Sequence, residues 1–267
     1  MERIATKKEL ALRLGIPRRT LYYTSKKAKN DWKLKGTIEE VLHEHPSYGH
    51  RRIALHLSLN KKRIRRVMRL YGIKPYRRRT KKQWKKPKEE KNIYTNLLLR
   101  IVPTRPHMIW VSDFTHIRWR GRWVYLATVM DIFTRRIVGW HVLAKHTTDL
   151  VLGALIHALN GHEPPTVVHS DQGSEYTSDE HIACLREHHI FPSMSHKGCP
   201  WENGYQESFY DKFKVDLGDP NRFDHLGQLI SMIYQTLYYY NTIRIHTALK
   251  MPPAVYAERL YERSISL

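Results

Sequence analysis

Cysteine is scarce in this sequence, and long apolar runs are absent. Among 267 residues only Cys184 and Cys199 occur, so a disulfide framework is excluded and a reducing cytosol is expected. No apolar run approaches the length of a membrane span, and the opening Met-Glu-Arg-Ile lacks the apolar core of a secretory signal peptide. We therefore expect a cytoplasmic protein.

Acidic residues are scarce in the first part of the chain. Residues 1–100 hold 30 Lys and Arg against 8 Asp and Glu, a net charge of +22, whereas residues 101–267 hold 16 against 17, a net charge of −1. This asymmetry favours a polyanion-binding front region joined to a catalytic or protein-binding domain. A merely soluble basic face is the weaker alternative, because the excess is confined to one part of the chain.

The first candidate DNA-binding element lies within residues 1–30. The pattern of residues 7–23 predicts a short helix, a turn at Gly15 and a second helix opened by Pro17, which is a helix-turn-helix arrangement. Leu10 and Leu14 are expected to face inward. Arg18 and Arg19 are expected to face DNA. A helical packing element without DNA contacts is an equal alternative.

A second helix-turn-helix domain is predicted over residues 36–75. Apolar spacing indicates one helix ending near Pro46, a second after Gly49, and a third that Asn60 caps and Gly72 ends. The third helix contains no acid, so its basic face is expected to contact phosphates rather than to form a mixed solvated surface. The expected DNA contacts in this domain are Arg51, Arg52, Lys61, Lys62, Arg63, Arg65, Arg66 and Arg69.

Residues 76–102 form the predicted basic linker. Residues 74–92 have almost no apolar content and carry like charges, which favours an extended segment until DNA neutralises it. Arg77, Arg78 and Arg79 are its expected DNA contacts.

The pattern changes from residue 103 onward. Strands are predicted at 108–117, 123–131 and 136–143, followed by helices alternating with strands at 166–169 and 190–194. Three antiparallel strands followed by this alternation predict an α/β, ribonuclease-H-like catalytic core over residues 103–267, with a five-stranded mixed sheet and C-terminal helices. The chain as a whole is therefore expected to be an all-α helix-turn-helix region followed by this core.

Three acids are candidates for a metal site. Asp113 lies among apolar residues in the first strand, and Asp171 directly follows the strand at 166–169. Glu207 lies on the helix predicted over 202–217. An ionised Asp in an apolar strand needs a partner, and carboxylates at strand ends are firmly held. Three such acids can hold two divalent cations beside a phosphodiester, with Mg²⁺ as the expected ion.

The same predicted helix leaves the choice of its ligand open. Glu207, Asp211, Asn203 and Lys214 share one face, whereas Glu202 points elsewhere and suits a first-turn acid that stabilises the helix dipole. A plain Glu–Lys surface face is the alternative to a ligand face. A zinc site is the poorest reading, since the Cys and His residues lack finger spacing.

Several motifs together resemble a known family. Asp-Phe-Thr stands at 113–115 and His-Ser-Asp-Gln-Gly-Ser at 169–174. A third motif runs from Ser193 to Phe209 and includes Lys197-Gly198 and Glu207-Ser208. A basic residue follows Glu207 by seven positions, at Lys214. The closing signature falls on Tyr240, Asn241, Arg244, His246, Leu249 and Pro253.

With this spacing the sequence resembles the DDE transposases of bacterial insertion-sequence family three, of the OrfB type, and the catalytic core of retroviral-type integrases. The resemblance covers roughly residues 38–260. It departs at Glu202, where Asp is more usual, and at Gly204, where Ala is more usual.

The resemblance implies an Mg²⁺-dependent transposase that binds the terminal inverted repeats of an insertion sequence, cleaves the 3′ end and transfers the strand to target DNA. Asp113, Asp171 and Glu207 would be both catalytic and metal-binding, with two Mg²⁺ ions for which Mn²⁺ substitutes. Further DNA contacts are expected at Lys197, Lys214, Arg244 and His246. Joining two ends implies a homo-oligomer of two or more protomers, associated with the nucleoid when bound to DNA.

Two other classes of function remain open from the sequence. One is a non-catalytic DNA-binding regulator, in which loss of an acid would leave binding and phenotype unchanged. The other is a structure-selective nuclease of the same fold, which would hydrolyse DNA without a joined product.

Overall fold

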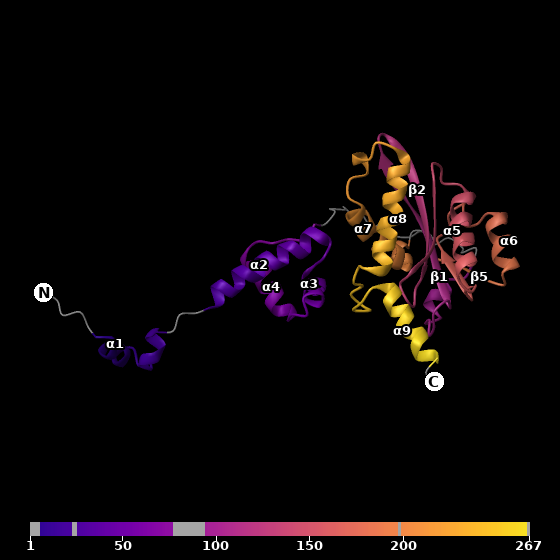
Figure 1. Ribbon diagram of the computed structural model, residues 1–267. Helices are drawn as coiled ribbons and strands as arrows, with labels where there is room; N and C mark the ends of the chain where they lie inside the picture. Colours follow the sequence, from indigo (N-terminus) through magenta and orange to yellow (C-terminus); the bar gives the residue numbers. More distant parts are fainter. Residues whose placement is uncertain (1–5, 23–25, 77–93, 197–198, 266–267) are drawn as a thin grey trace.

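The computed structural model describes residues 6–22, 26–76, 94–196 and 199–265 of the chain (Figure 1). The front part is helical and contains α1 (Lys7–Arg13), the 3₁₀ helix η1 (Arg18–Tyr22), α2 (Lys27–Glu44), α3 (His50–His56) and α4 (Lys61–Leu70). None of the helices in the described ranges has the length and apolar character that crossing a membrane requires.

The first segment differs from its predicted form. Thr6 and Glu9 form a capping box that starts α1, but the second element is a five-residue 3₁₀ helix instead of an α-helix. Leu10 and Leu14, which were expected to face inward, are 41% and 57% exposed. The inward orientation was therefore wrong, because so short a second helix offers too little apolar surface to cover both leucines.

Helices α2, α3 and α4 form one compact unit, which we call the helical unit (residues 26–76). Its buried core includes Ile38, Ile53 and Ile64, one from each helix. The Asn60 side chain accepts a hydrogen bond from the backbone N–H of Lys62 and so caps α4, as predicted. Gly72, with φ of 66°, takes the left-handed conformation just past the end of α4. Helix α2 begins nine residues before the predicted start of this domain.

The core is built on a five-stranded sheet. Its strands are β1 (Ile109–Trp119), β2 (Arg122–Asp131), β3 (Ile137–Leu143), β4 (Val167–Ser170) and β5 (Phe191–Met194), in the order β3-β2-β1-β4-β5. The first three strands are antiparallel neighbours, and β1–β4 and β4–β5 are parallel. All five lie within a few residues of their predicted positions.

Helices cover both faces of the sheet (Figure 1). On one face α7 (Gly204–Leu217) and α8 (Leu226–Thr242) pack with the inward side chains of β1 and β2. On the other face lie α5 (Thr148–Gly161) and α6 (Asp179–Glu187). Helix α5 approaches β3 so closely that a Cβ at Gly139 would lie 2.3 Å from the carbonyl oxygen of Ala154. Only glycine, which has no Cβ, allows this contact, so α5 can pack closely on the sheet.

Short 3₁₀ helices and the last α-helix complete the core. They are η2 (Leu97–Leu99), η3 (Pro200–Asn203), η4 (Pro220–Arg222) and α9 (Pro253–Ile265). Asp131, at the end of β2, accepts hydrogen bonds from the backbone N–H of Phe133 and from the N–H and hydroxyl of Thr134. It therefore caps the turn that leads to β3.

The helical unit contacts the core at the turn that follows α8, and we call this contact the junction. Arg244 is 1% exposed, and its Nε lies 2.8 Å from Oδ2 of Asp216 on α7. Its Nη2 donates to the hydroxyl of Ser47, at 3.0 Å. One buried arginine thus joins α7 to the segment between α2 and α3.

Neighbouring bonds strengthen the junction. The backbone N–H of Ile245 donates to the Tyr48 hydroxyl at 2.9 Å, and the Nε of Arg52 donates to the Ile245 carbonyl oxygen at 2.8 Å. His45 Nδ1 and the Tyr239 hydroxyl lie 2.7 Å apart. Ile245 also packs against the core of the helical unit. Polar and apolar contacts together fix the two parts against each other.

Candidate active site

The pairing of β1 with β4 determines where the first two acids lie. Val111 of β1 is opposite His169 of β4 in a parallel register. Asp113 and Asp171 each follow two residues later in the same direction. Since Val111 packs on the face that α7 covers, alternation along β1 places Asp113 on that face as well. Two acids that are 58 positions apart in sequence are thereby brought to neighbouring strands.

Helix α7 is hydrogen-bonded to the backbone of β1 and β2 next to Asp113. The side-chain amide of Gln206 donates to the carbonyl oxygens of Val111, at 2.8 Å, and of Thr128, at 3.1 Å. One turn later, the Tyr210 hydroxyl donates to the carbonyl oxygen of Asp113 at 2.6 Å. Glu207 follows Gln206 directly, so the hydrogen bonds of Gln206 and Tyr210 fix the position of Glu207 along β1.

The charges of the other two acids act on the Asp113 carboxyl group. Burial, and then the negative charges of Asp171 and Glu207, raise the pKa of Asp113 to about 8, whereas the Lys214 ammonium lowers it. Although part of Asp171 is exposed, burial of its carboxyl group and the charge of Glu175 also raise its pKa. A buried carboxyl beside like charges is stabilised by a cation. The donor set therefore fits a site for a divalent cation.

The ligand atoms of the three acids are not packed tightly around one point. Among the described residues, the group of three acidic, His or Cys side chains whose ligand atoms all lie within 4.8 Å of one another is Glu44, His45 and His56. Asp113, Asp171 and Glu207 do not meet this distance. Asp113 instead accepts a bond from the Phe114 N–H, and Asp171 accepts one from the Gly173 N–H.

Buried hydroxyl groups support the acids from beneath. The Thr128 hydroxyl lies 2.8 Å from that of Tyr210 and 3.0 Å from Oε1 of Gln206. On the other side of β1, the hydroxyls of Ser112 and Tyr176 are 3.3 Å apart. Gln206 and Tyr210 were not among the predicted site residues, although their i, i+4 spacing on the helix of Glu207 was the available signal.

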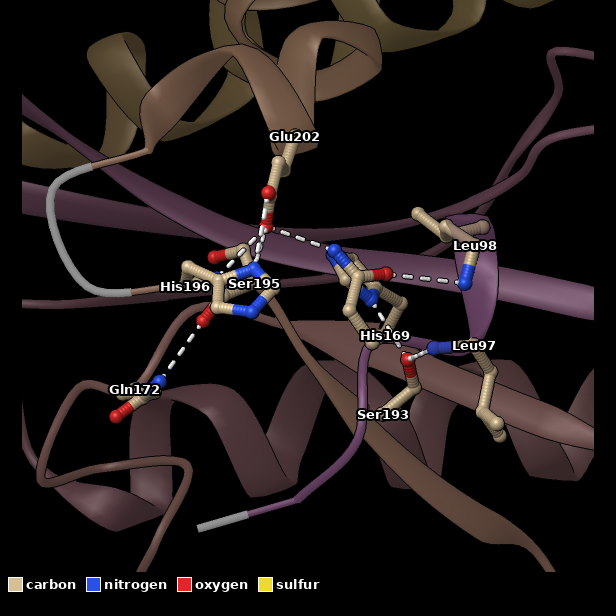
Figure 2. A network of polar contacts seen from close by, with 9 residues as sticks. Leu97, Leu98, His169, Gln172, Ser193, Ser195, His196 and Glu202 are labelled. Carbon is tan, nitrogen blue, oxygen red and sulfur yellow. Dashed lines mark hydrogen bonds and ion pairs between the residues drawn. The ribbon is translucent and has the colours of Figure 1, made fainter. Parts of the chain in front are cut away.

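Glu202 is the centre of a separate network (Figure 2). Its Oε2 accepts from the side-chain amide of Asn96 and from the backbone N–H of His196, both at 2.7 Å. Helix α7 begins at Gly204, so Glu202 lies in η3 before the helix. Its expected role as a first-turn acid of α7 is therefore replaced by a tie between two segments.

The network continues to β4, the strand that ends directly before Asp171. The Ser193 hydroxyl accepts from the Leu97 N–H and lies 2.9 Å from Nδ1 of His169. Gln172, directly after Asp171, donates to the Ser195 carbonyl oxygen at 2.9 Å (Figure 2). The network therefore fixes the segments that lead into Asp171 and into the helix of Glu207.

Comparisons with known proteins agree with this geometry. The chain matches the family described as integrase core domain over residues 103–200, and a second family of the same description over residues 188–253. It is 34% identical over 226 residues to the transposase for insertion sequence element IS904 of Lactococcus lactis, which covers 81% of this chain and 89% of that protein. The chain belongs to the insertion-sequence transposases. It is thus a DDE-type polynucleotidyl transferase.

Two further relatives support the family and the fold. The InsK protein of insertion sequence element IS150 from Escherichia coli is 33% identical over 266 residues, with 95% of this chain and 94% of that protein covered. A chain of a simian T-cell lymphotropic virus intasome superposes with a TM-score of 0.52 at 16% identity, over 81% of this chain and 73% of that chain. The predicted ribonuclease-H-like fold of the integrase core is confirmed.

Eight of the seventeen predicted DNA contacts in this transposase are exposed on its surface. Arg77, Arg78, Arg79 and Lys197 lie outside the described residues. Lys214 lies near enough to Asp113 to lower its pKa. The predicted contacts that are exposed are Arg18, Arg19, Arg51, Lys61, Lys62, Arg63, Arg65 and Arg69.

Four predicted DNA contacts are placed differently. Arg66 makes two hydrogen bonds to Asp31 of α2, at 2.6 and 2.5 Å, so it faces α2 rather than outward. Arg52 and Arg244 are held at the junction. Burial and the charges of nearby arginines lower the pKa of His246 to about 4, so its ring is neutral near pH 7. Sequence patterns could not show these intramolecular partners.

Proposed function

We propose that this transposase binds the terminal inverted repeats of its insertion sequence, cleaves the 3′ end and joins that end to target DNA. The observation that supports the proposal is the β1–β4 register, in which Asp113 and Asp171 each follow a paired residue by two positions, together with the bond from Tyr210, on the helix of Glu207, to the Asp113 carbonyl oxygen. Water would attack first and the freed 3′-hydroxyl second, both in line at phosphorus and without a covalent protein intermediate.

The same three acids are the proposed ligands of two Mg²⁺ ions, for which Mn²⁺ would substitute. All-oxygen ligand sets suit Mg²⁺. The raised pKa of Asp113 supports this assignment, because like charges crowd a buried carboxyl that a cation would stabilise. When bound, the ions would make the attacking water or hydroxyl more acidic and stabilise the leaving oxygen.

The remaining residues position the substrate. Lys214, beside Asp113, supports contact with a phosphate of the reacting strand. The exposed cations of α4 support binding of double-stranded DNA by the helical unit. Because two DNA ends must be joined, we infer an assembly of two or more protomers. The proposed location is the bacterial cytoplasm, at the nucleoid when DNA is bound.

The test incubates the purified protein with labelled terminal-repeat DNA and Mg²⁺. Wild type is expected to nick the DNA and to give a joined product, and Asp171→Asn to give neither while still binding DNA. Asp179→Asn makes the same substitution at an exposed acid of α6 and is expected to behave as wild type.

Other outcomes select the alternative classes. Hydrolysis without a joined product would indicate a structure-selective nuclease. DNA binding without any cleavage, equal in wild type and Asp171→Asn, would indicate a non-catalytic regulator.

A further inference from the structure

A pocket of about 460 Å³ lies where the helical unit meets the core. Arg52 of α3 lines it from the helical unit. Arg135, in the turn between β2 and β3, lines it from the sheet, and Lys212 lines it from α7. Arg244 and His246 complete the wall after α8. Its volume is within the range of small-ligand sites. We call it the junction pocket.

Positive charge dominates the junction pocket. Four of its lining residues are Arg or Lys, and the acid that lines it, Glu202, already accepts bonds from Asn96 and His196. Asp216 lies behind Arg244 and pairs with it. Burial and the neighbouring Arg244 lower the pKa of Arg52 to about 10, which shows that these cations are crowded in a partly desolvated place.

The polar atoms of the pocket are held in place but are not all satisfied. The Arg135 guanidinium lies over the Tyr205 ring, 4.2 Å from its centroid, and the Arg135 carbonyl oxygen accepts from the Tyr240 hydroxyl. Yet the buried Nη1 of Arg135 and Nδ1 of His246 have no hydrogen-bond partner among the described residues. Buried polar atoms are normally bonded, and a guanidinium group can only donate, so the unpaired Nη1 of Arg135 points to a ligand with acceptor oxygens.

Two further hollows border the pocket along α7, each sharing lining residues with the one before it. A hollow of about 430 Å³ shares Arg52 and Lys212 with it, and is also lined by Arg51. A third, of about 590 Å³, adjoins the second at Tyr76 and Val215 and reaches Lys214. A chain of phosphates, as in a DNA strand, fits this series of basic hollows better than an isolated small anion does.

We propose that the junction pocket binds a backbone phosphate of the DNA strand that enters the active site. The proposal rests on the proposed function and adds a phosphate contact that both parts of the chain build and that none of the three acids lines. Arg135 and Lys212 are its principal ligands, because Arg52 and Arg244 also hold the junction together.

The test measures how the affinity for a terminal-repeat duplex falls with salt, using the full chain. Each phosphate contact contributes about 0.9 to the slope of log K against log salt. Arg135→Gln is expected to reduce the slope by about that amount, and Arg135→Lys, which keeps the charge, to retain it. Arg186→Gln, at an exposed arginine of α6, is the matched control and is expected to retain it too.

If Arg135→Gln does not fold, Lys212→Gln on the opposite wall replaces it, with the same expected loss. A slope in Arg135→Gln equal to that in Arg186→Gln overturns the proposal. So does an equal loss in Arg135→Lys, which would indicate a packing role over Tyr205. Cleavage and joining by wild type, measured in parallel, keep such a failure distinct from failure of the proposed function.

A second measurement separates DNA from free phosphate compounds. Chloride is replaced by inorganic phosphate at constant ionic strength, and the thermal midpoint is compared between wild type and Arg135→Gln. An unchanged midpoint together with the reduced DNA slope supports the backbone phosphate. A midpoint that phosphate raises in wild type alone, with an unchanged DNA slope, identifies a free phosphate ligand and overturns the DNA assignment.

Discussion

The exposed face of α4 and the junction both use arginine, but in opposite surroundings. On α4, Arg63, Arg65 and Arg69 are exposed and ready for phosphates. At the junction, Arg244 is buried against Asp216, and Arg52 donates to a backbone carbonyl. The charge of a residue therefore does not determine its role, which depends on the partners of its side chain.

The energetic consequences of the two settings also differ. An exposed cation loses little solvation and contributes mainly to binding polyanions, in a manner that salt weakens. A buried arginine loses its solvation, so removing it leaves its partner uncompensated in the interior. Substitutions in the two regions should therefore affect different measured quantities.

The largest effect on stability is expected from Arg244→Met. It leaves Asp216 buried without its cation, which should lower the free energy of unfolding by about 3–5 kcal/mol. Chemical denaturation of the full chain measures this change. Arg186→Met, on the exposed face of α6, is the control and should change stability by less than about 0.5 kcal/mol.

The double variant Arg244→Met with Asp216→Leu sharpens the result. Because it removes both charges, most of the lost stability should return. If the double variant is as unstable as Arg244→Met alone, the ion pair is not the cause.

A smaller effect is expected at the pair formed by Asp31 and Arg66, since Arg66 is partly exposed. The hydrogen bond that Asp31 accepts from Arg66 lowers the pKa of Asp31 below the ordinary value of 3.8. Because the pKa of Asp31 is lower in the folded state, the ion pair stabilises the fold fully above pH 3.8. This stabilisation is lost as the pH falls through the pKa of Asp31 in the folded state. Asp31→Asn should therefore lower the thermal midpoint near neutral pH, and the difference from wild type should vanish in acid. A difference that persists at low pH would contradict this account.

The smallest effect separates two adjacent residues of α4. Arg65 is exposed, whereas Arg66 pairs with Asp31. Arg65→Gln should reduce the salt slope of DNA binding by about 0.9, if it contacts one phosphate, with little change in stability. Arg66→Gln should leave the slope unchanged and lower the thermal midpoint. Equal loss of slope in both variants would show that the pairing does not withdraw Arg66 from DNA.

The sequence predicted the core well for a physical reason. Alternating apolar residues identify β1 to β3, and the cap at Asn60 and the turn at Gly72 delimit α4, because these signals are local. The prediction of an α-helix as the second element of the first segment was wrong, because five residues are too few to show a helical period.

The candidate site was predictable only in part. The spacing of motifs identified Asp113, Asp171 and Glu207, but the register that brings them together is a property of the paired strands. Asp31, Asp216 and Asn96, which are partners of Arg66, Arg244 and Glu202, lie 35, 28 and 106 positions away from them, so no local pattern contains these pairs. The junction pocket has the same origin, because it forms only when α3 meets the turn after α8.

The most direct test of the central claim compares two acids that are five positions apart. Binding of Mn²⁺ to the protein on terminal-repeat DNA is followed by electron paramagnetic resonance in wild type, Glu207→Gln and Glu202→Gln. We predict that Glu207→Gln weakens metal binding, whereas Glu202→Gln, whose amide oxygen can still accept the bonds from Asn96 and His196, binds as wild type. Metal binding that is unchanged in Glu207→Gln would contradict the assignment of the three acids to one site.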